Sequence, residues 1–96
     1  MMTIQGFTDS LKNQEPPKGI SEIALALWYD AKGDWEAAHN IAQAQEGVRD
    51  YDLLHAYLHR KEGDEWNAKY WYARAKSKKP KVSLDEEWEE LVTYFL

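Results

Sequence analysis

Two stretches of the chain repeat the same order of residue types at a fixed spacing. Residues 26–39 read ALWYDAKGDWEAAH and residues 56–69 read AYLHRKEGDEWNAK, so that Gly33-Asp34 returns 30 residues later as Gly63-Asp64. A self-similarity of this period is typical of stacked supersecondary units, because each unit is too small to bury its own apolar face. The repeat therefore predicts an architecture and leaves the activity open.

Composition restricts the class of protein. The 96 residues are enough for one domain with a modest core, to which five Trp, six Tyr and two Phe supply much of the apolar area. The absence of Cys excludes thiolate metal sites, disulfides and cysteine nucleophiles. No apolar stretch reaches the roughly 18 residues of a membrane span, and the N-terminus lacks the pattern of a secretion signal. The net charge of −5 disfavours nucleic acid as a partner. We expect a soluble, cytoplasmic protein that binds neither membranes nor nucleic acid.

The chain divides into an arm and one all-α domain. Residues 1–19 lack a sustained period and end in a proline-rich stretch that cannot continue a helix, so we predict an N-terminal arm with a short turn over 8–13. Residues 20–96 are predicted to form two stacked antiparallel helical hairpins, 20–47 and 50–78, closed by a capping helix over 83–95. The four hairpin helices are expected over 21–32, 35–46, 51–62 and 65–77.

Helix stop and start signals give these bounds. Three helices end at a glycine, which tolerates the left-handed conformation found after a helix: Gly33, Gly47 and Gly63. Three aspartates are placed to cap the helix that follows each of them: Asp34, Asp50 and Asp64. Pro80 closes the repeat. Ser83 and Glu86 form a capping box, in which each side chain is expected to bond the other's backbone N–H.

Winding each helix at about 100° per residue predicts which side chains are buried. The helix over 21–32 has one apolar arc: Ile23, Ala24, Leu27, Trp28 and Ala31. The helix over 35–46 buries Trp35, Ala37, Ala38, Ile41 and Ala42, and turns away Glu36, His39, Asn40 and Gln43. The capping helix has one apolar stripe: Leu84, Trp88, Leu91, Val92 and Phe95. Its acidic run, 85–90, is expected to be solvated and to offset the basic run 76–81.

Several positions have the spacing of a known repeat. In the second copy they are the turn Gly63-Asp64, the small residues Ala68 and Ala75, the aromatic Tyr72 and the closing Pro80. In the first copy they are Gly33-Asp34, Trp35 and Ala38. This pattern, over about residues 24–80, resembles the tetratricopeptide repeat, and it departs from that family at His55 and His59, where Leu and Tyr are usual. The resemblance implies stacked helical hairpins. The string over 56–64 also resembles short bacterial proteins of uncharacterised function, which implies no activity.

The helix over 65–77 is apolar on nearly all sides, and a polar pair interrupts it. Asn67 and Arg74 lie two turns apart between Tyr70 and Trp71. A guanidinium and an amide between flat aromatic walls suit recognition of a ligand. We therefore predict a binding groove between the helices over 35–46 and 65–77, lined by His39, Gln43, Asn67, Tyr70, Trp71 and Arg74. The alternative is structural: Arg74 pairs with a carboxylate and Asn67 bonds a neighbouring loop.

The helix over 51–62 carries a second candidate site. His55, His59 and Glu62 follow one another at spacings of four and three, which places them on one helix face. Two imidazoles one turn apart can share a metal ion, with Glu62 or His39 as a third ligand. Ala56 stands where metalloproteases carry their general base. The alternative is that these histidines hydrogen-bond a neighbouring helix.

Two functions follow from these features. The sequence favours a binding or scaffold module for a protein segment that has no cofactor and is not an enzyme, because it lacks a phosphate-binding loop and a nucleophile elbow. The alternative is a small-molecule or metal-binding protein that uses His39, His55, His59 and Glu62.

Assembly is predicted from the open end of the first hairpin. The helix over 21–32 has further apolar residues that no preceding repeat covers: Leu25, Ala26 and Trp28. Either the arm, through Ile4, Phe7 and Leu11, or a second copy of the chain would cover this face. Burial of the three arm side chains is worth on the order of 5 kcal/mol, and ordering about a dozen arm residues costs at least that much. We therefore predict a weak homodimer.

Overall fold

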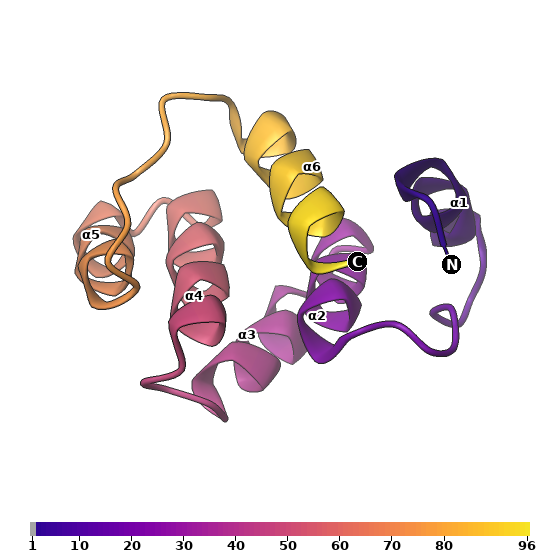
Figure 1. The fold of residues 1–96 in the computed structure, drawn as a ribbon, viewed down its shortest axis with the longest axis horizontal. Coiled ribbons are helices and arrows are strands. Elements are labelled where there is room, and N and C mark those ends of the chain that lie inside the picture. The colour runs from indigo at the N-terminus through magenta and orange to yellow at the C-terminus, as the bar shows by residue number, and fades with distance from the viewer. Residues whose placement is uncertain (1) are drawn as a thin grey trace.

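The computed structural model describes residues 2–96, which form six α-helices and one short 3-10 helix (Figure 1). They are α1 (Ile4–Asp9), η1 (Ser10–Lys12), α2 (Glu22–Ala31), α3 (Trp35–Gln43), α4 (Arg49–Lys61), α5 (Glu65–Arg74) and α6 (Leu84–Phe95). No strand occurs in residues 2–96, so the all-α prediction is confirmed. α2 packs on α3, α4 packs on α5, and α3 lies against α4, which places the two hairpins side by side.

In the turn of each hairpin a glycine follows the end of the first helix and an aspartate caps the second, as predicted. Gly33 and Gly63 adopt left-handed conformations, with φ of 87° and 86°. Asp34 and Asp64 cap the following helices, since their carboxylates accept the backbone N–H groups three residues on at 3.1 and 3.2 Å. The predicted cap at Asp50 is wrong, because α4 begins at Arg49, one residue earlier. The loop before α4 is held instead by Asp52, whose carboxylate accepts the N–H of Gly47 at 3.0 Å.

Two helices are shorter than predicted. α3 ends at Gln43, before the expected 46, because the chain passes into a series of tight turns that lead to Val48. α5 ends at Arg74, before the expected 77. Lys76 takes a left-handed φ of 55°, and the Ser77 N–H reaches back to the carbonyl of Tyr72 at 2.9 Å. Lys76 thus takes the left-handed position that glycine usually holds after the end of a helix. The sequence contains no glycine or proline there that would have predicted this end.

α6 lies across α2 and α4, the first helices of the two hairpins. Its predicted apolar stripe packs against the core, and the Trp88 indole donates to the carbonyl of Leu27 at 3.0 Å. Ser83 caps the helix as predicted. The capping box differs in one bond, because the Glu86 carboxylate accepts the Ser83 hydroxyl at 3.2 Å rather than a backbone N–H. Ala31, predicted to be buried, is exposed at the end of α2.

The N-terminal arm is folded onto the domain. It forms α1 and η1 where only a short turn was predicted, and Phe7 is fully buried in the core with its ring 5.9 Å from that of Trp88. The Trp28 indole donates to the Ser10 hydroxyl at 3.1 Å. Ala26 and Trp28 are buried. The expectation that this face of α2 is open is therefore wrong, and the predicted homodimer loses the surface on which it depended.

Two buried carboxylates link the helices. Glu87 accepts from Arg60 at 2.7 Å and from the Tyr72 hydroxyl at 2.6 Å, which joins α6 to α4 and α5. Asp30 of α2 pairs with Lys61 of α4 at 2.9 Å. The prediction that the whole acidic run of α6 is solvated is wrong at Glu87, because i, i+3 spacing places this residue on the buried side next to Leu84 and Leu91.

Candidate functional site

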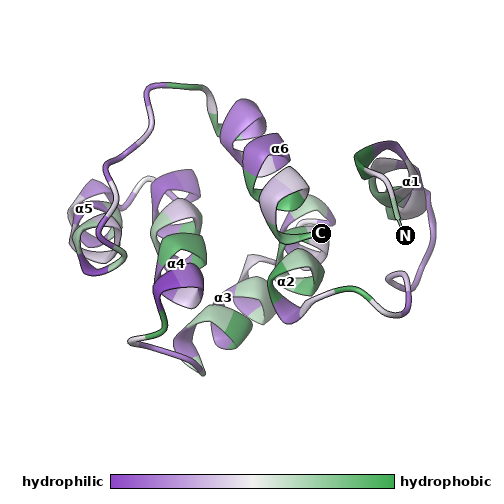
Figure 2. Ribbon diagram, viewed as in Figure 1, coloured by the Kyte–Doolittle hydropathy of each residue, from purple (hydrophilic) through white to green (hydrophobic). Residues whose placement is uncertain are grey.

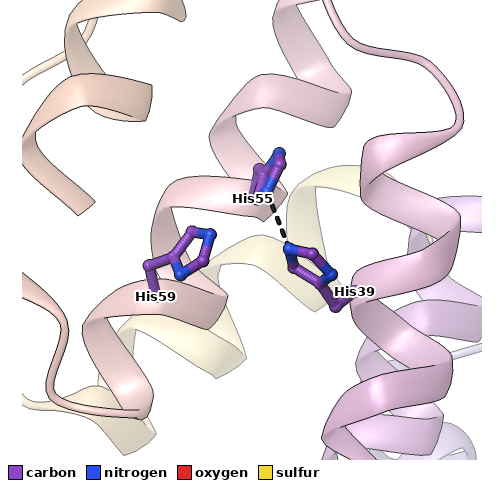
Figure 3. Close-up of side chains that lie close together, drawn as sticks. All are labelled: His39, His55 and His59. Carbon is purple, nitrogen blue, oxygen red and sulfur yellow. Dashed lines mark hydrogen bonds between the residues drawn. The ribbon is translucent and has the colours of Figure 1, made fainter. Parts of the chain in front are cut away.

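Three histidines converge between the two hairpins (Figure 3). His39 comes from α3, and His55 and His59 lie one turn apart on α4. The Nε2 atoms of His39 and His55 are 2.9 Å apart, and one nitrogen of each ring lies within 4.8 Å of the others. His39 is half-buried against α4, so its predicted place on the solvent face of α3 is wrong. We call these residues the histidine cluster.

Two tryptophans hold the rings of the histidine cluster. Trp35, one turn before His39 on α3, stacks on that imidazole with the ring centroids 4.6 Å apart. The Trp35 indole N–H donates to the carbonyl of Leu58 at 2.8 Å, which fixes the start of α3 against α4. On the other side Trp71 of α5 stacks on His55 at 4.0 Å. Helices α3, α4 and α5 all contribute to this arrangement, so it depends on the packing of both hairpins.

Burial keeps two of the imidazoles neutral near pH 7. His55 is only 3% exposed, and this burial, with a smaller contribution from the other two histidines, lowers its pKa to about 4. Burial and then the charge of His59 lower the pKa of His39, against the opposing charges of Glu62 and Glu46. Within residues 2–96 the Nδ1 atom of His55 has no hydrogen-bond partner. A neutral imidazole has a free lone pair on one ring nitrogen. The cluster therefore suits a bound group that accepts electron pairs from nitrogen.

Glu62 orients His59 rather than joining the other two histidines. Its carboxylate lies 2.7 Å from His59 Nδ1, which leaves Nε2 as the free nitrogen of that ring. Carboxylates that hold a histidine in this way fix the ring orientation at metal sites. Glu62 also forms a second close group with His59 and Asp64. Asp64 is less available there, since both of its oxygens accept hydrogen bonds from Asn67.

The residues of the predicted groove fall into different surroundings. His39 and Trp71 both contact His55. Gln43 is exposed and bonds Asn40 at 3.0 Å, and Asn67 bonds Asp64 as the structural alternative supposed. Tyr70 and Arg74, the last two residues of the predicted groove, lie on the outer side of α5. The Arg74 guanidinium donates to the Tyr70 hydroxyl at 2.9 Å.

Two residues near these surfaces were not predicted as site residues. Trp35 was assigned to the core, although its position one turn before His39 was a usable signal. Trp66 is the most exposed large aromatic residue of the part of the chain that is described. In helical register Trp66 corresponds to the exposed Glu36, because Glu65 takes the place after the capping aspartate that Trp35 holds in the first copy.

No family model, curated protein or solved structure matches this chain. Within residues 2–96 every helix is too short or too polar to cross a lipid bilayer.

We expect the metal-free protein to lose stability as the pH falls below 6.5. His55 has a folded pKa of about 4, below its unfolded value of 6.5, so the unfolded chain takes up a proton first. The contribution of His55 is present above pH 6.5 and should fall by about 2 kcal/mol by pH 5. Urea unfolding at pH 7.5 and pH 5 measures it. The variant His55→Gln lacks this imidazole but keeps the other titrating groups, so it serves as the control. An equal loss of stability between pH 7.5 and pH 5 in this variant and the wild type would contradict the assignment to His55.

Proposed function

We propose that the protein binds one divalent transition-metal ion through His39, His55 and His59. The observation that supports this function is the convergence of one nitrogen from each ring to within 4.8 Å. Zn–N bonds of about 2.0–2.1 Å in tetrahedral geometry place two ligand nitrogens about 3.3 Å apart. The Nε2 atoms of His39 and His55, 2.9 Å apart, are slightly closer than that, so these two rings would have to move slightly apart to share the ion.

The ligand set favours zinc, copper or nickel. Neutral imidazole nitrogens suit these ions, whereas magnesium and calcium require oxygen ligands. The lowered pKa values of His39 and His55 favour binding at neutral pH, because no proton has to leave these rings first. Three imidazoles would leave a fourth position for water or another ligand. We propose metal binding and no catalysis, because the geometry supports a set of three metal ligands and nothing more.

The test is a calorimetric titration of Zn²⁺ into untagged, metal-free protein at pH 7.5. We expect one ion per chain and at least a 100-fold loss of affinity in His55→Ala and in His59→Ala. Glu62→Ala should weaken binding by about 10–100-fold, because it removes only the group that orients His59. Asn40→Ala, an exposed neighbour of His39 on α3, is the control and should bind as the wild type does. Absence of binding to the wild type, or unchanged binding by folded His55→Ala, would contradict the proposal.

Binding of a protein segment is the second candidate function. The exposed aromatic and cationic side chains of α5 support it, because such residues are enriched where proteins recognise one another. The tetratricopeptide-like spacing in the sequence supports the same proposal. These side chains lie on the outer side of α5 and none of them belongs to the histidine cluster, so different variants test the two functions.

A further inference from the structure

An exposed ridge runs along the outer side of α5. Trp66 is 75% exposed and Tyr70 is 44% exposed, and their rings lie nearly parallel with centroids 6.2 Å apart. Arg74 continues the line one turn further, with its guanidinium 5.7 Å from the centre of the Tyr70 ring. The i, i+4, i+8 spacing places the three side chains in one row. We call Trp66, Tyr70 and Arg74 the α5 ridge.

The surroundings of the ridge are strongly basic. Residues 65–81 contain six of the 12 basic residues of the chain and one acidic residue, Glu65. Glu65 pairs with Lys79 at 3.1 Å. Most of the link from α5 to α6 is hydrophilic, apart from an apolar stretch just before α6 (Figure 2). Although the whole chain has a net charge of −5, this segment, with six basic residues and one acidic residue, has a net charge of +5.

An acidic groove lies elsewhere on the surface, between α1 and α6. It has a volume of about 750 Å³ and is lined by Ile4, Glu86, Glu89, Glu90, Thr93 and Tyr94. Tyr94 is 71% exposed. Residues 84–95 contain five acidic residues and no basic one. The expected pairing of this run with the basic run 76–81 is absent from residues 2–96, where Glu87 alone of the run forms an ion pair. We call this surface the α6 groove.

We propose that the α5 ridge of one copy docks in the α6 groove of a second copy. The two surfaces are complementary in charge, since the ridge ends in a guanidinium within a basic segment and the groove is lined by three glutamates with a tyrosine at one end. Glu86, Glu90 and Tyr94 repeat the i, i+4, i+8 spacing of the ridge. Antiparallel docking therefore brings Arg74 to Glu86 and Trp66 to Tyr94.

A second copy is the occupant because both complementary surfaces are exposed on the same chain and cannot meet within it. α5 lies at one end of the molecule and α1, which borders the groove, lies at the other (Figure 1). Each copy offers one ridge and one groove. Two copies form a closed dimer if each ridge docks in the other copy's groove; if only one ridge docks, a free ridge and a free groove remain and the association continues to larger species. This interface differs from the α2 face on which the homodimer was predicted, and it does not depend on the histidine cluster.

Sedimentation velocity over a wide concentration range tests the docking. In 50 mM NaCl the wild type should associate, with a dissociation constant at least tenfold weaker in 500 mM NaCl because the paired charges are exposed. Arg74→Glu and Glu86→Arg should each weaken self-association at least tenfold. An equimolar mixture of the two variants should associate as the wild type does, because each supplies the surface that the other has lost.

Two further variants make the result specific. Lys18→Glu, at an exposed residue of the arm, changes the net charge as Arg74→Glu does and should associate normally. Trp66→Ala should also weaken association, and its side chain is too exposed to matter for folding. A wild type that stays monomeric, or association that survives both charge reversals, would overturn the proposal. A monomer that binds a polyglutamate peptide would do so as well, and would identify another acidic protein as the occupant.

Discussion

Phe7→Ala should lower the free energy of unfolding by about 3–5 kcal/mol, a large share of the roughly 5–15 kcal/mol that stabilises a domain of this size. Phe7 is fully buried although it belongs to the arm, and it packs in the core that α2, α4 and α6 share. Its truncation removes buried apolar surface and leaves a cavity that the surrounding helices cannot close completely. Urea unfolding followed by tryptophan fluorescence measures the change.

Gln5→Ala is the matched control for the arm. Gln5 lies on the same helix as Phe7 but is exposed, and its side chain donates to the Asp9 carboxylate at 3.0 Å, also at the surface, so the expected change is below about 0.5 kcal/mol. A loss below about 1 kcal/mol in Phe7→Ala would show that the arm contributes little to the fold. The face of α2 would then again be available for association with a second copy.

Glu87→Ala should lower the free energy of unfolding by about 3–5 kcal/mol, because it leaves buried partners without their acceptor. The Glu87 side chain is 4% exposed, and that of Arg60 is 14% exposed. Without the carboxylate, Arg60 loses its ion pair but keeps its bond to the carbonyl of Val82, and the buried Tyr72 hydroxyl loses its acceptor. Burial, together with the bond to Glu87 and its charge, raises the pKa of Tyr72, so this phenol stays protonated and donates.

Glu89→Ala provides the comparison within the same helix. Glu89 is exposed, and its removal should change the free energy of unfolding by less than about 0.5 kcal/mol. Thermal or urea unfolding of both variants measures the difference. Equal stabilities of Glu87→Ala and Glu89→Ala would show that the buried network does not hold α6 on the hairpins.

Much of the fold could be predicted because its signals are local. Gly33, Gly63, Asp34 and Asp64 act through their own backbone and their immediate neighbours, so their spacing was enough to locate both hairpin turns. The end of α5 was missed because a lysine, Lys76, adopts the conformation that usually marks a glycine. The arm was missed because Phe7 is buried by residues that follow it by more than 80 positions, among them Trp88.

The candidate site could be predicted in part. The spacing of His55 and His59 placed them on one face of α4, and His39 of α3 lies against that face. His39 was assigned to solvent because a helical wheel takes no account of the neighbouring helix, and α4 covers that side of α3. The burial of Glu87 likewise depends on Arg60 and Tyr72, which only tertiary packing brings to it.

The most direct measurement of the proposed metal site is X-ray absorption spectroscopy on the untagged protein loaded with one equivalent of Zn²⁺. The convergence of His39, His55 and His59 predicts three imidazole nitrogens at about 2.0–2.1 Å, with water or another ligand at the fourth position. The imidazole signal should fall by one ring in each single histidine variant that still binds the ion. A shell of oxygen ligands alone, or an imidazole count unchanged in His55→Ala, would contradict the assignment of these three residues as a metal site.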